Sequence, residues 1–381
     1  MTNVLSGILR QSNLDLLREI NRLSSVLATV SAPTELVTYQ DMVSEACRYL
    51  RGLILQNLQY LDLSRDDILD DILSQTQSVT AVFRLYNQRI ASVLLRYRPS
   101  DRLCLRIIGW LHAQHARTRD IPAGLDDGEF GVWPEPRVPL IYFMPSSGQH
   151  GLLYLPLFFH EFGHLLYACH REEMDALVRD LQAEIAALLE PILQRDGLPA
   201  HPDAENRNRI VERWYEWAQE LFCDAVGLTI GGPCFANAFS MYLRMGGRGK
   251  FYLPREQLEL SEHPVAWLRI RLIVERARQV NLVEADRLES EWDQIAARMQ
   301  IVENHCGFYE HRFLPPIRKA IDDMLTEGSP YKFSADDVSP HRWNAKSSSP
   351  VHLLNTAWSA FLNDPGGYAG WEEQAITTFL Q

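Results

Sequence analysis

The stretch FFHEFGHLLYACH, from Phe158 to His170, places two histidines and a glutamate among apolar neighbours near the middle of the chain. His160 and His164 stand four residues apart, and on an α-helix this spacing puts both imidazoles on one face. Glu161 follows His160 directly. The H-E-x-x-H pattern therefore predicts a buried helix whose polar stripe binds one metal ion, with Glu161 holding the water that the metal polarises.

Gly163 lies inside the same expected helix. A glycine in a helix interior destabilises it by about 1 kcal/mol relative to alanine, so we expect another backbone or a cleft to come close at this position. The five-residue pattern alone leaves an alternative open, in which His160 and His164 are core histidines with ordinary hydrogen-bond partners. A metal site needs a third ligand from elsewhere in the chain.

The segment ERWYEWAQELFCDAVGLTIGGP, residues 212–233, offers that ligand on a second expected helix. Glu220 and Asp224 stand four residues apart on one face, and their apolar neighbours favour an inward position over a solvated surface. Glu220 can be the third ligand, which leaves a fourth position open for water or substrate. Asp224 can accept a hydrogen bond from the far ring nitrogen of a ligating histidine. Glu216, one turn before Glu220, is the alternative ligand.

A third segment, SEHPVAWLRIRLI, covers residues 261–273. Pro264 fits the first turn of a new helix, which places His263 at the start of that helix. His263 can serve as a fourth metal ligand or donate to the oxyanion of a tetrahedral intermediate, or it can be a helix-start residue without a chemical role. Arg269 can pair with an acidic residue of the second helix. Further candidate oxyanion donors, each also readable as a packing aromatic, are Tyr167, Tyr215 and Tyr242.

Taken together, H-E-x-G-H, E-x-x-x-D and H-P-x-x-x-x-R resemble the motifs of the gluzincin metallopeptidases, in particular the family of CAAX prenyl proteases and HtpX-type peptidases. The resemblance covers about residues 140–275. It implies a zinc endopeptidase with a zincin-like core and Glu161 as general base, in which Asp224 has a supporting role and His263 and Arg269 lie near the site. The ligands that it implies for Zn²⁺ are His160, His164 and Glu220.

The same resemblance implies that the edge strand of a sheet holds the substrate backbone, and RVPLIYFMP, residues 137–145, is the candidate strand. Those relatives commonly carry membrane spans. No run of about 18 apolar residues occurs in this chain, so we expect no membrane span and do not carry over prenylated substrates.

The rest of the chain predicts a mainly α-helical protein with a small β-sheet, of the α+β class. We expect long amphipathic helices over 12–30, with Ser12 and Asn13 as caps, over 34–61 and over 64–97. The Gly- and Pro-rich residues 120–139 predict a loop and 138–145 a strand, and helices return from about 152. The predicted domains are an N-terminal helical region (1–100), a metallopeptidase core (101–280) and a C-terminal helical region packed on it (281–381).

Composition limits the classes of function. The chain of 381 residues has a formal net charge of −12, which argues against general nucleic-acid binding. The arginine-bearing stretches 102–110 and 244–255 can still form local basic patches, although a solvated surface is the simpler interpretation. Six scattered cysteines indicate reduced thiols, and the N-terminus lacks the apolar core of a secretory signal. We therefore expect a cytoplasmic protein.

These observations favour a zinc-dependent endopeptidase with a protein or peptide substrate. One alternative is a catalytically silent scaffold that keeps the metalloprotease core for interactions. Another is a regulatory protease that stays latent until a partner protein binds the N-terminal helical region, with His263 closing the open coordination position.

Overall fold

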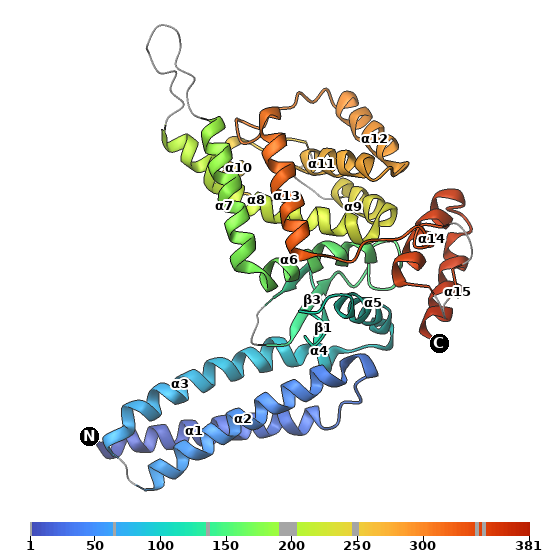
Figure 1. The fold of residues 1–381 in the computed structure, drawn as a ribbon. Coiled ribbons are helices and arrows are strands. Elements are labelled where there is room, and N and C mark those ends of the chain that lie inside the picture. Colours follow the sequence, from blue (N-terminus) through green and yellow to red (C-terminus); the bar gives the residue numbers. More distant parts are fainter. Residues whose placement is uncertain are drawn as a thin grey trace. The chain divides into compact units, whose positions relative to one another are not determined.

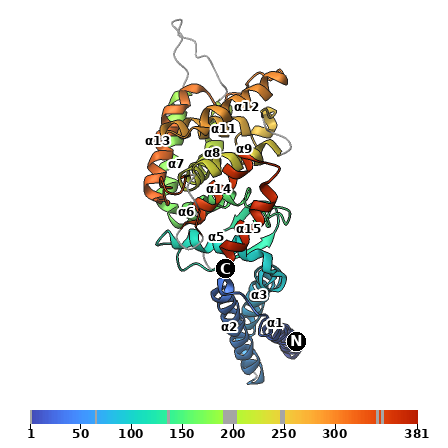
Figure 2. The same cartoon turned by 90° about the vertical axis from the view of Figure 1, so that its right-hand side faces the viewer.

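The structure is a computed structural model that describes residues 2–63, 66–134, 138–189, 204–245, 251–339, 343–344 and 348–381. It is mainly helical with one three-stranded sheet, which confirms the predicted α+β class (Figures 1 and 2). The contacts divide the chain into two compact units. One comprises residues 1–109 and 120–150, and the other comprises residues 110–119 and 151–381. Whether the regions 1–100, 101–280 and 281–381 fold as separate domains stays a prediction.

Long amphipathic helices build the first unit, as predicted. They are α1 (Thr2–Leu27), α2 (Val37–Asp62) and α3 (Leu69–Leu85), followed by a π-helical turn (Tyr86–Ile90), α4 (Ala91–Arg96) and the start of α5 (Arg102–Ala113). The first three helices pack side by side (Figure 1). Their apolar positions recur at helical spacing, so each helix buries one stripe against the other two.

A buried polar network joins α1, α2 and α3, and it corrects the prediction that Ser12 and Asn13 cap a helix. Asn13 lies inside α1, where its amide nitrogen donates to the carbonyl of Leu9 at 2.8 Å and to the hydroxyl of Thr76 at 2.9 Å. Asn57 of α2 donates to the Asn13 side-chain oxygen at 3.2 Å. Asparagine tends to end helices because it hydrogen-bonds nearby backbone, but here partners on other helices satisfy it.

The sheet consists of β1 (Ala123–Asp127), β2 (Gly131–Trp133) and β3 (Leu140–Met144) in the order β1-β3-β2. β1 pairs with β3 in parallel and β2 pairs with β3 antiparallel. The prediction of a loop over 120–139 was therefore wrong, because two strands lie in that range. The expected substrate-binding strand was also placed wrongly: β3 is the central strand and has a main-chain partner on each side, so it offers no free edge for a peptide.

The second unit consists almost entirely of helices, in which α6 packs along α8, and α7 and α13 pack against α8 (Figure 1). α8 ends where Gly232 adopts a positive φ of 57° and Pro233 begins the next helix. The helices are α6 (Phe158–Cys169), α7 (Arg171–Leu188), α8 (Ala204–Gly231), α9 (Pro233–Met245), α10 (Arg255–Leu258), α11 (Ala266–Gln279), α12 (Glu284–Arg298), α13 (Leu314–Gly328), α14 (Pro350–Asn363) and α15 (Tyr368–Leu380).

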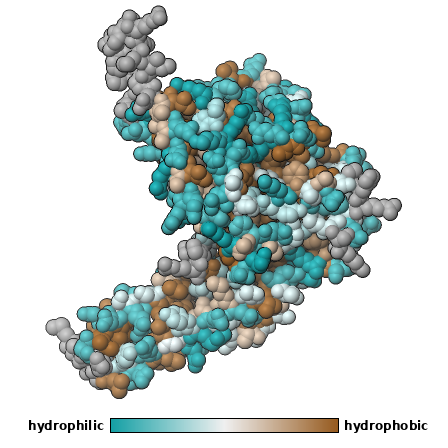
Figure 3. All heavy atoms as spheres, viewed as in Figure 1, coloured by the Kyte–Doolittle hydropathy of each residue, from teal (hydrophilic) through white to brown (hydrophobic). Residues whose placement is uncertain are grey.

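The surface is mixed. On the face in Figure 3, apolar side chains lie among polar ones, and exposed apolar residues of α1–α3 include Ile8, Leu55 and Val82. Of the two arginine-bearing stretches, 102–110 falls in α5, where Arg102 and Arg106 lie 3.3–3.4 Å from the carboxylate of Glu35. Residues 246–250 of the other stretch lie outside the described residues.

None of the described helices has an apolar stretch long enough to cross a membrane.

Gly163 lies where α6 crosses α8. A glycine in a helix interior is unfavourable, and its presence here predicted such a close approach. A methyl group added at Gly163 would stand 2.7 Å from the Cα atom of Cys223 and 3.0 Å from its Cβ and Sγ atoms. The obstacle is partly backbone, so it cannot rotate away. Glycine is therefore required for the close approach of the two helices that carry the candidate metal ligands.

We predict that Gly163→Ala destabilises the protein by about 1–3 kcal/mol, although alanine is the better helix former. The overlap with the Cα atom of Cys223 outweighs the gain of about 1 kcal/mol in helix propensity. Urea denaturation measures the change. Gly109→Ala in α5 is the matched control, because nothing lies within 4 Å of its added methyl group and the substitution should stabilise. A stabilising Gly163→Ala substitution would contradict the contact.

Candidate metal centre

α6 and α8 bring together the three side chains that the sequence proposed as ligands. His160 and His164 lie one turn apart on α6, with ring centroids separated by 5.1 Å and ring planes 83° apart. Nε2 of His160 lies 3.4 Å from Oε2 of Glu220, and Nε2 of His164 lies 3.4 Å from Oε1 of the same carboxylate. The three ligand atoms lie within 4.8 Å of one another.

These distances are compatible with one small ion between the three side chains. Nitrogen and carboxylate oxygen bind zinc at about 2.0–2.2 Å, which separates neighbouring ligand atoms of a tetrahedron by about 3.3–3.5 Å. Each imidazole lies 3.4 Å from a different oxygen of the Glu220 carboxylate, and one atom from each residue lies within 4.8 Å of the others. Two imidazoles and one carboxylate are also the donor set of many catalytic zinc sites, in which the fourth position stays open. Within the described residues this is the one group of three or more such side chains that can hold a metal ion.

Asp224 lies next to His160, as the sequence predicted, but the predicted hydrogen bond between them is not formed with good geometry. Nδ1 of His160 lies 2.9 Å from Oδ1 of Asp224. The contact is close but not well aligned, since Nδ1 has no partner of good hydrogen-bond geometry among the described residues. A carboxylate at Nδ1 favours the tautomer that carries its proton there and leaves Nε2 free to bind a metal.

Arg269 of α11 joins this arrangement and is buried, with 5% of its surface exposed. Its guanidinium donates to both carboxylate oxygens of Asp224, at 2.6 and 2.8 Å, and to Oε2 of Glu220 at 3.2 Å. The structure thus shows the expected pairing of Arg269 with acidic residues of the second helix. Because one guanidinium donates to both carboxylates, it holds both of them in fixed orientations.

Sequence reasoning missed Phe239 of α9. Its ring stacks against the imidazole of His160, with centroids 6.0 Å apart and planes 23° apart. The guanidinium carbon of Arg269 lies 4.9 Å from the centroid of the same ring. Phe239 therefore helps to hold both side chains. An aromatic residue in an apolar helix resembles any core residue, so no signal in the sequence distinguished it.

His263 lies beside the ligands, but its backbone differs from the prediction. α11 begins at Ala266, so Pro264 precedes the helix rather than forming its first turn. Nε2 of His263 lies 3.2 Å from Oε2 of Glu220, and half of the side chain is exposed. Burial lowers the pKa of His263 against the opposing charge of Glu220, so the ring is neutral at pH 7. It stands at the exposed edge of the group of candidate ligands.

Other candidates lie apart from this group. The carboxylate of the alternative ligand, Glu216, pairs with Arg213 and is 43% exposed. The hydroxyls of Tyr167 and Tyr215 both donate to Asp175 of α7, at 2.7 and 2.9 Å. Those two hydroxyls are engaged away from the metal ligands. Tyr242 is on α9 and partly exposed.

The pKa values of the candidate ligands depend strongly on burial and on the charges of neighbouring side chains. Burial opposes a proton on His160, but the hydrogen bonds and charges of Asp224 and Glu220 outweigh it and raise its pKa to about 10 in the metal-free protein. Burial lowers the pKa of His164 to about 4. Burial alone would raise the pKa of Glu220, yet its contacts with His160 and Arg269 hold it well below its usual range. Glu220 is therefore a carboxylate at every pH at which the protein is expected to work.

Glu161 is buried, with 7% of its surface exposed. No hydrogen bond or ion pair of its carboxylate to another described residue is found. Burial raises its pKa from 4.5 to about 7, with a lowering contribution from His160 and a raising one from Glu220. A carboxylate with a pKa near neutrality is suited to both accept and release a proton at neutral pH.

The raised pKa of Glu161 predicts a pH-dependent gain of stability for Glu161→Gln in the metal-free protein. Below pH 4.5 the carboxyl is protonated in the folded and unfolded states, so it contributes nothing. Above pH 7 the folded state carries the full penalty, about 3 kcal/mol. The variant should therefore be more stable than the parent at pH 8 and equal to it at pH 4. Urea denaturation at both pH values measures this, and a gain of the same size at pH 4 would contradict the assignment.

The geometry thus places two imidazoles, one carboxylate and a supporting carboxylate–arginine pair around one point, with Glu161 buried nearby. Comparison of the chain with models of known protein families, with curated proteins and with solved structures finds no match.

Proposed function

We propose that the protein is a zinc-dependent endopeptidase of the gluzincin type, whose zincin-like core is built on α6 and α8. The observation that carries the proposal is the convergence of His160, His164 and Glu220, whose ligand atoms lie within 4.8 Å of one another. The resemblance of the three motifs to the CAAX prenyl protease and HtpX-type family supports the same reading.

In this proposal His160, His164 and Glu220 hold the ion. Zinc, when bound, would polarise a peptide carbonyl and lower the pKa of a water molecule toward 7. Asp224 keeps His160 in the tautomer with Nε2 free, and Arg269 holds Asp224 and Glu220 in place. These residues fix the site before substrate arrives, which reduces reorganisation during the reaction.

Glu161 acts as general base and then as general acid. Its carboxylate accepts a proton from the attacking water and delivers it to the nitrogen of the leaving amine. His263, exposed at the rim and close to Glu220, is placed to donate a hydrogen bond to the oxygen of the scissile carbonyl. Tyr242 of α9 is the remaining tyrosine candidate for that role, because Tyr167 and Tyr215 are bound to Asp175.

The substrate in this proposal is a protein or peptide. β3 cannot hold it as an added strand, since both of its edges are paired. The exposed apolar residues of α1–α3 offer contact points for an activating partner.

The first test is the zinc content of the purified full-length chain. We expect one zinc ion per chain, lost on His160→Ala and retained on His112→Ala, a buried histidine of α5 outside the metal group. Loss of one of three ligands should weaken zinc binding by more than the 10- to 100-fold that removal of a supporting residue causes. A chain without stoichiometric zinc would favour the alternative, a catalytically silent scaffold.

The second test concerns proteolysis. A proteome-wide comparison of new protein ends, made with zinc-loaded and zinc-stripped protein, should show a set of ends that depends on zinc. If the zinc-loaded protein produces no new ends in cell extract, the endopeptidase proposal fails even where zinc is bound. New ends that appear in native extract, but not when purified proteins of that extract are the substrate, would support a protease that needs an activating partner.

A further inference from the structure

A groove separate from the metal ligands runs between α8, α11, α13 and the segment 330–333. Its outer part has a volume of about 510 Å³, within the range of roughly 300–1,000 Å³ that is typical of small-molecule sites. Its inner part is narrower, about 50 Å³. Arg276, Gln279 and Asp322 line both parts, so the two adjoin each other.

The walls of the groove combine apolar residues with charged and polar ones. The apolar residues of the inner part are Leu221, Ala225, Leu272, Ile273, Ile317 and Ile321. The apolar residues of the outer part are Leu228, Val280, Leu325, Pro330 and Phe333. Burial of an apolar chain against these residues would lower the free energy, because apolar surface is removed from water.

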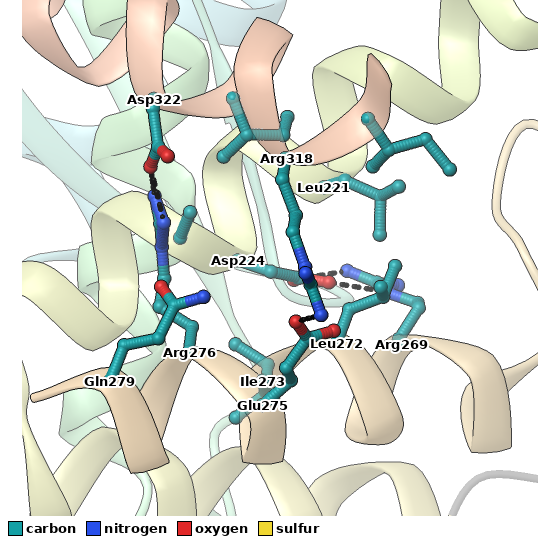
Figure 4. Close-up of a pocket in the computed structure, with 13 residues that line it drawn as sticks. Leu221, Asp224, Arg269, Leu272, Ile273, Glu275, Arg276, Gln279, Arg318 and Asp322 are labelled. Atoms are coloured by element: carbon teal, nitrogen blue, oxygen red, sulfur yellow. Dashed lines mark hydrogen bonds and ion pairs between the residues drawn. The ribbon is translucent and has the colours of Figure 1, made fainter. Parts of the chain in front are cut away.

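Two ion pairs span the groove from α11 to α13, as Figure 4 shows. Arg276 donates to Asp322, and Arg318 pairs with Glu275. At the inner end, Asp224 and Arg269 are paired with each other. Each of these charges is therefore compensated within the protein.

Lys332 is the exception. It lines the outer part of the groove, and no ion pair of its ammonium group is found within the described part of the chain. The lining of the outer part thus carries one net positive charge, from Arg276 and Lys332 against Asp322, in a protein whose formal net charge is −12. An isolated cation beside an apolar wall is complementary to a ligand with one negative charge and an apolar body.

We propose that this groove binds a small amphipathic carboxylate, of the class of medium-chain fatty acids. Its hydrocarbon chain lies in the outer part of the groove, along Leu228, Val280 and Leu325, and its carboxylate pairs with Lys332. This site uses none of the metal ligands, so it stands or falls independently of the proposed peptidase activity.

Isothermal titration of the full-length protein with decanoate, below its micelle concentration, tests the proposal. We expect saturable binding with a negative heat-capacity change, because apolar surface is buried. Decanol, with the same chain and no charge, should bind at least severalfold more weakly. Failure of decanoate to bind, or equal binding of decanol, would overturn the proposal.

Variants locate the site. Lys332→Gln should weaken decanoate binding by about fivefold, the effect of one partly exposed ion pair. Lys319→Gln removes the same charge from α13 outside the groove and should change nothing.

Thr326→Phe fills the outer part and should abolish binding, with an unchanged circular dichroism spectrum as evidence of folding. Equal affinity in Lys332→Gln and Lys319→Gln, or full binding by a folded Thr326→Phe variant, would overturn the assignment. So would binding of an apolar peptide with a free C-terminal carboxylate where decanoate does not bind.

Discussion

Glu161→Gln is expected to leave zinc content unchanged and to lower the rate of peptide-bond cleavage by about two to four orders of magnitude, the usual contribution of general acid–base catalysis. The amide has nearly the shape of the carboxylate but cannot accept a proton. Glu161 is not among the three side chains that converge as ligands, so the ion should remain. The measurement combines zinc analysis with the count of zinc-dependent protein ends.

Glu216→Gln is the matched control for this experiment. It makes the same chemical change on α8, one turn from Glu220, at an exposed carboxylate that pairs with Arg213. Cleavage by this variant should equal that of the parent. Undiminished cleavage by Glu161→Gln would refute the mechanism, whereas loss of zinc from that variant would show that Glu161 belongs to the ligand set.

Arg269→Met should reduce the free energy of unfolding of the metal-free protein by about 3–5 kcal/mol, a large part of the stability of a typical domain. Methionine replaces the aliphatic part of the arginine side chain but none of its donors. Asp224 and Glu220, which are 2% and 7% exposed, would then be buried carboxylates one turn apart on α8 that share a single nearby cation, the protonated His160. Urea denaturation in the presence of a chelator measures the loss.

Arg278→Met, on the same helix, is the comparison. Arg278 pairs with Asp286 and Glu289 at the surface, where ion pairs contribute less than about 1 kcal/mol. Similar losses for the two variants would mean that Arg269 contributes as an ordinary surface charge. Added zinc should restore part of the stability lost in Arg269→Met, because the ion supplies positive charge beside Glu220.

Much of the candidate site could be predicted because its residues are held by helix periodicity. Spacings of four place His160 with His164, and Glu220 with Asp224, on shared faces, and glycine at 163 pointed to the close approach of a second backbone. Phe239 was missed because its role depends on tertiary packing. His263 was found, but the start of its helix was not, since a proline fits before a helix as well as in its first turn.

The wrong predictions about the fold have a common cause. At these positions, hydrogen bonds to residues distant in the sequence determine the secondary structure, against the preference of the local sequence. β1 has the sequence AGLDD, which lacks β-branched and aromatic residues, and β2, with the sequence GVW, is too short to show an alternating pattern. They are strands because their backbones pair with β3. Asn13 lies within a helix because Thr76 and Asn57, far along the chain, complete its hydrogen bonds.

That asparagine network has a consequence for motion. If α1 slid by one turn along α2 and α3, the buried side chains of Asn13, Asn57 and Thr76 would lose their hydrogen bonds to one another, and each polar atom left without a partner would cost about 1–3 kcal/mol. Apolar packing alone would permit such a shift, whereas these hydrogen bonds form in only one register of the three helices. The helices α1, α2 and α3 are thus suited to move together as one rigid body, so that a displacement at one end would be transmitted to the other.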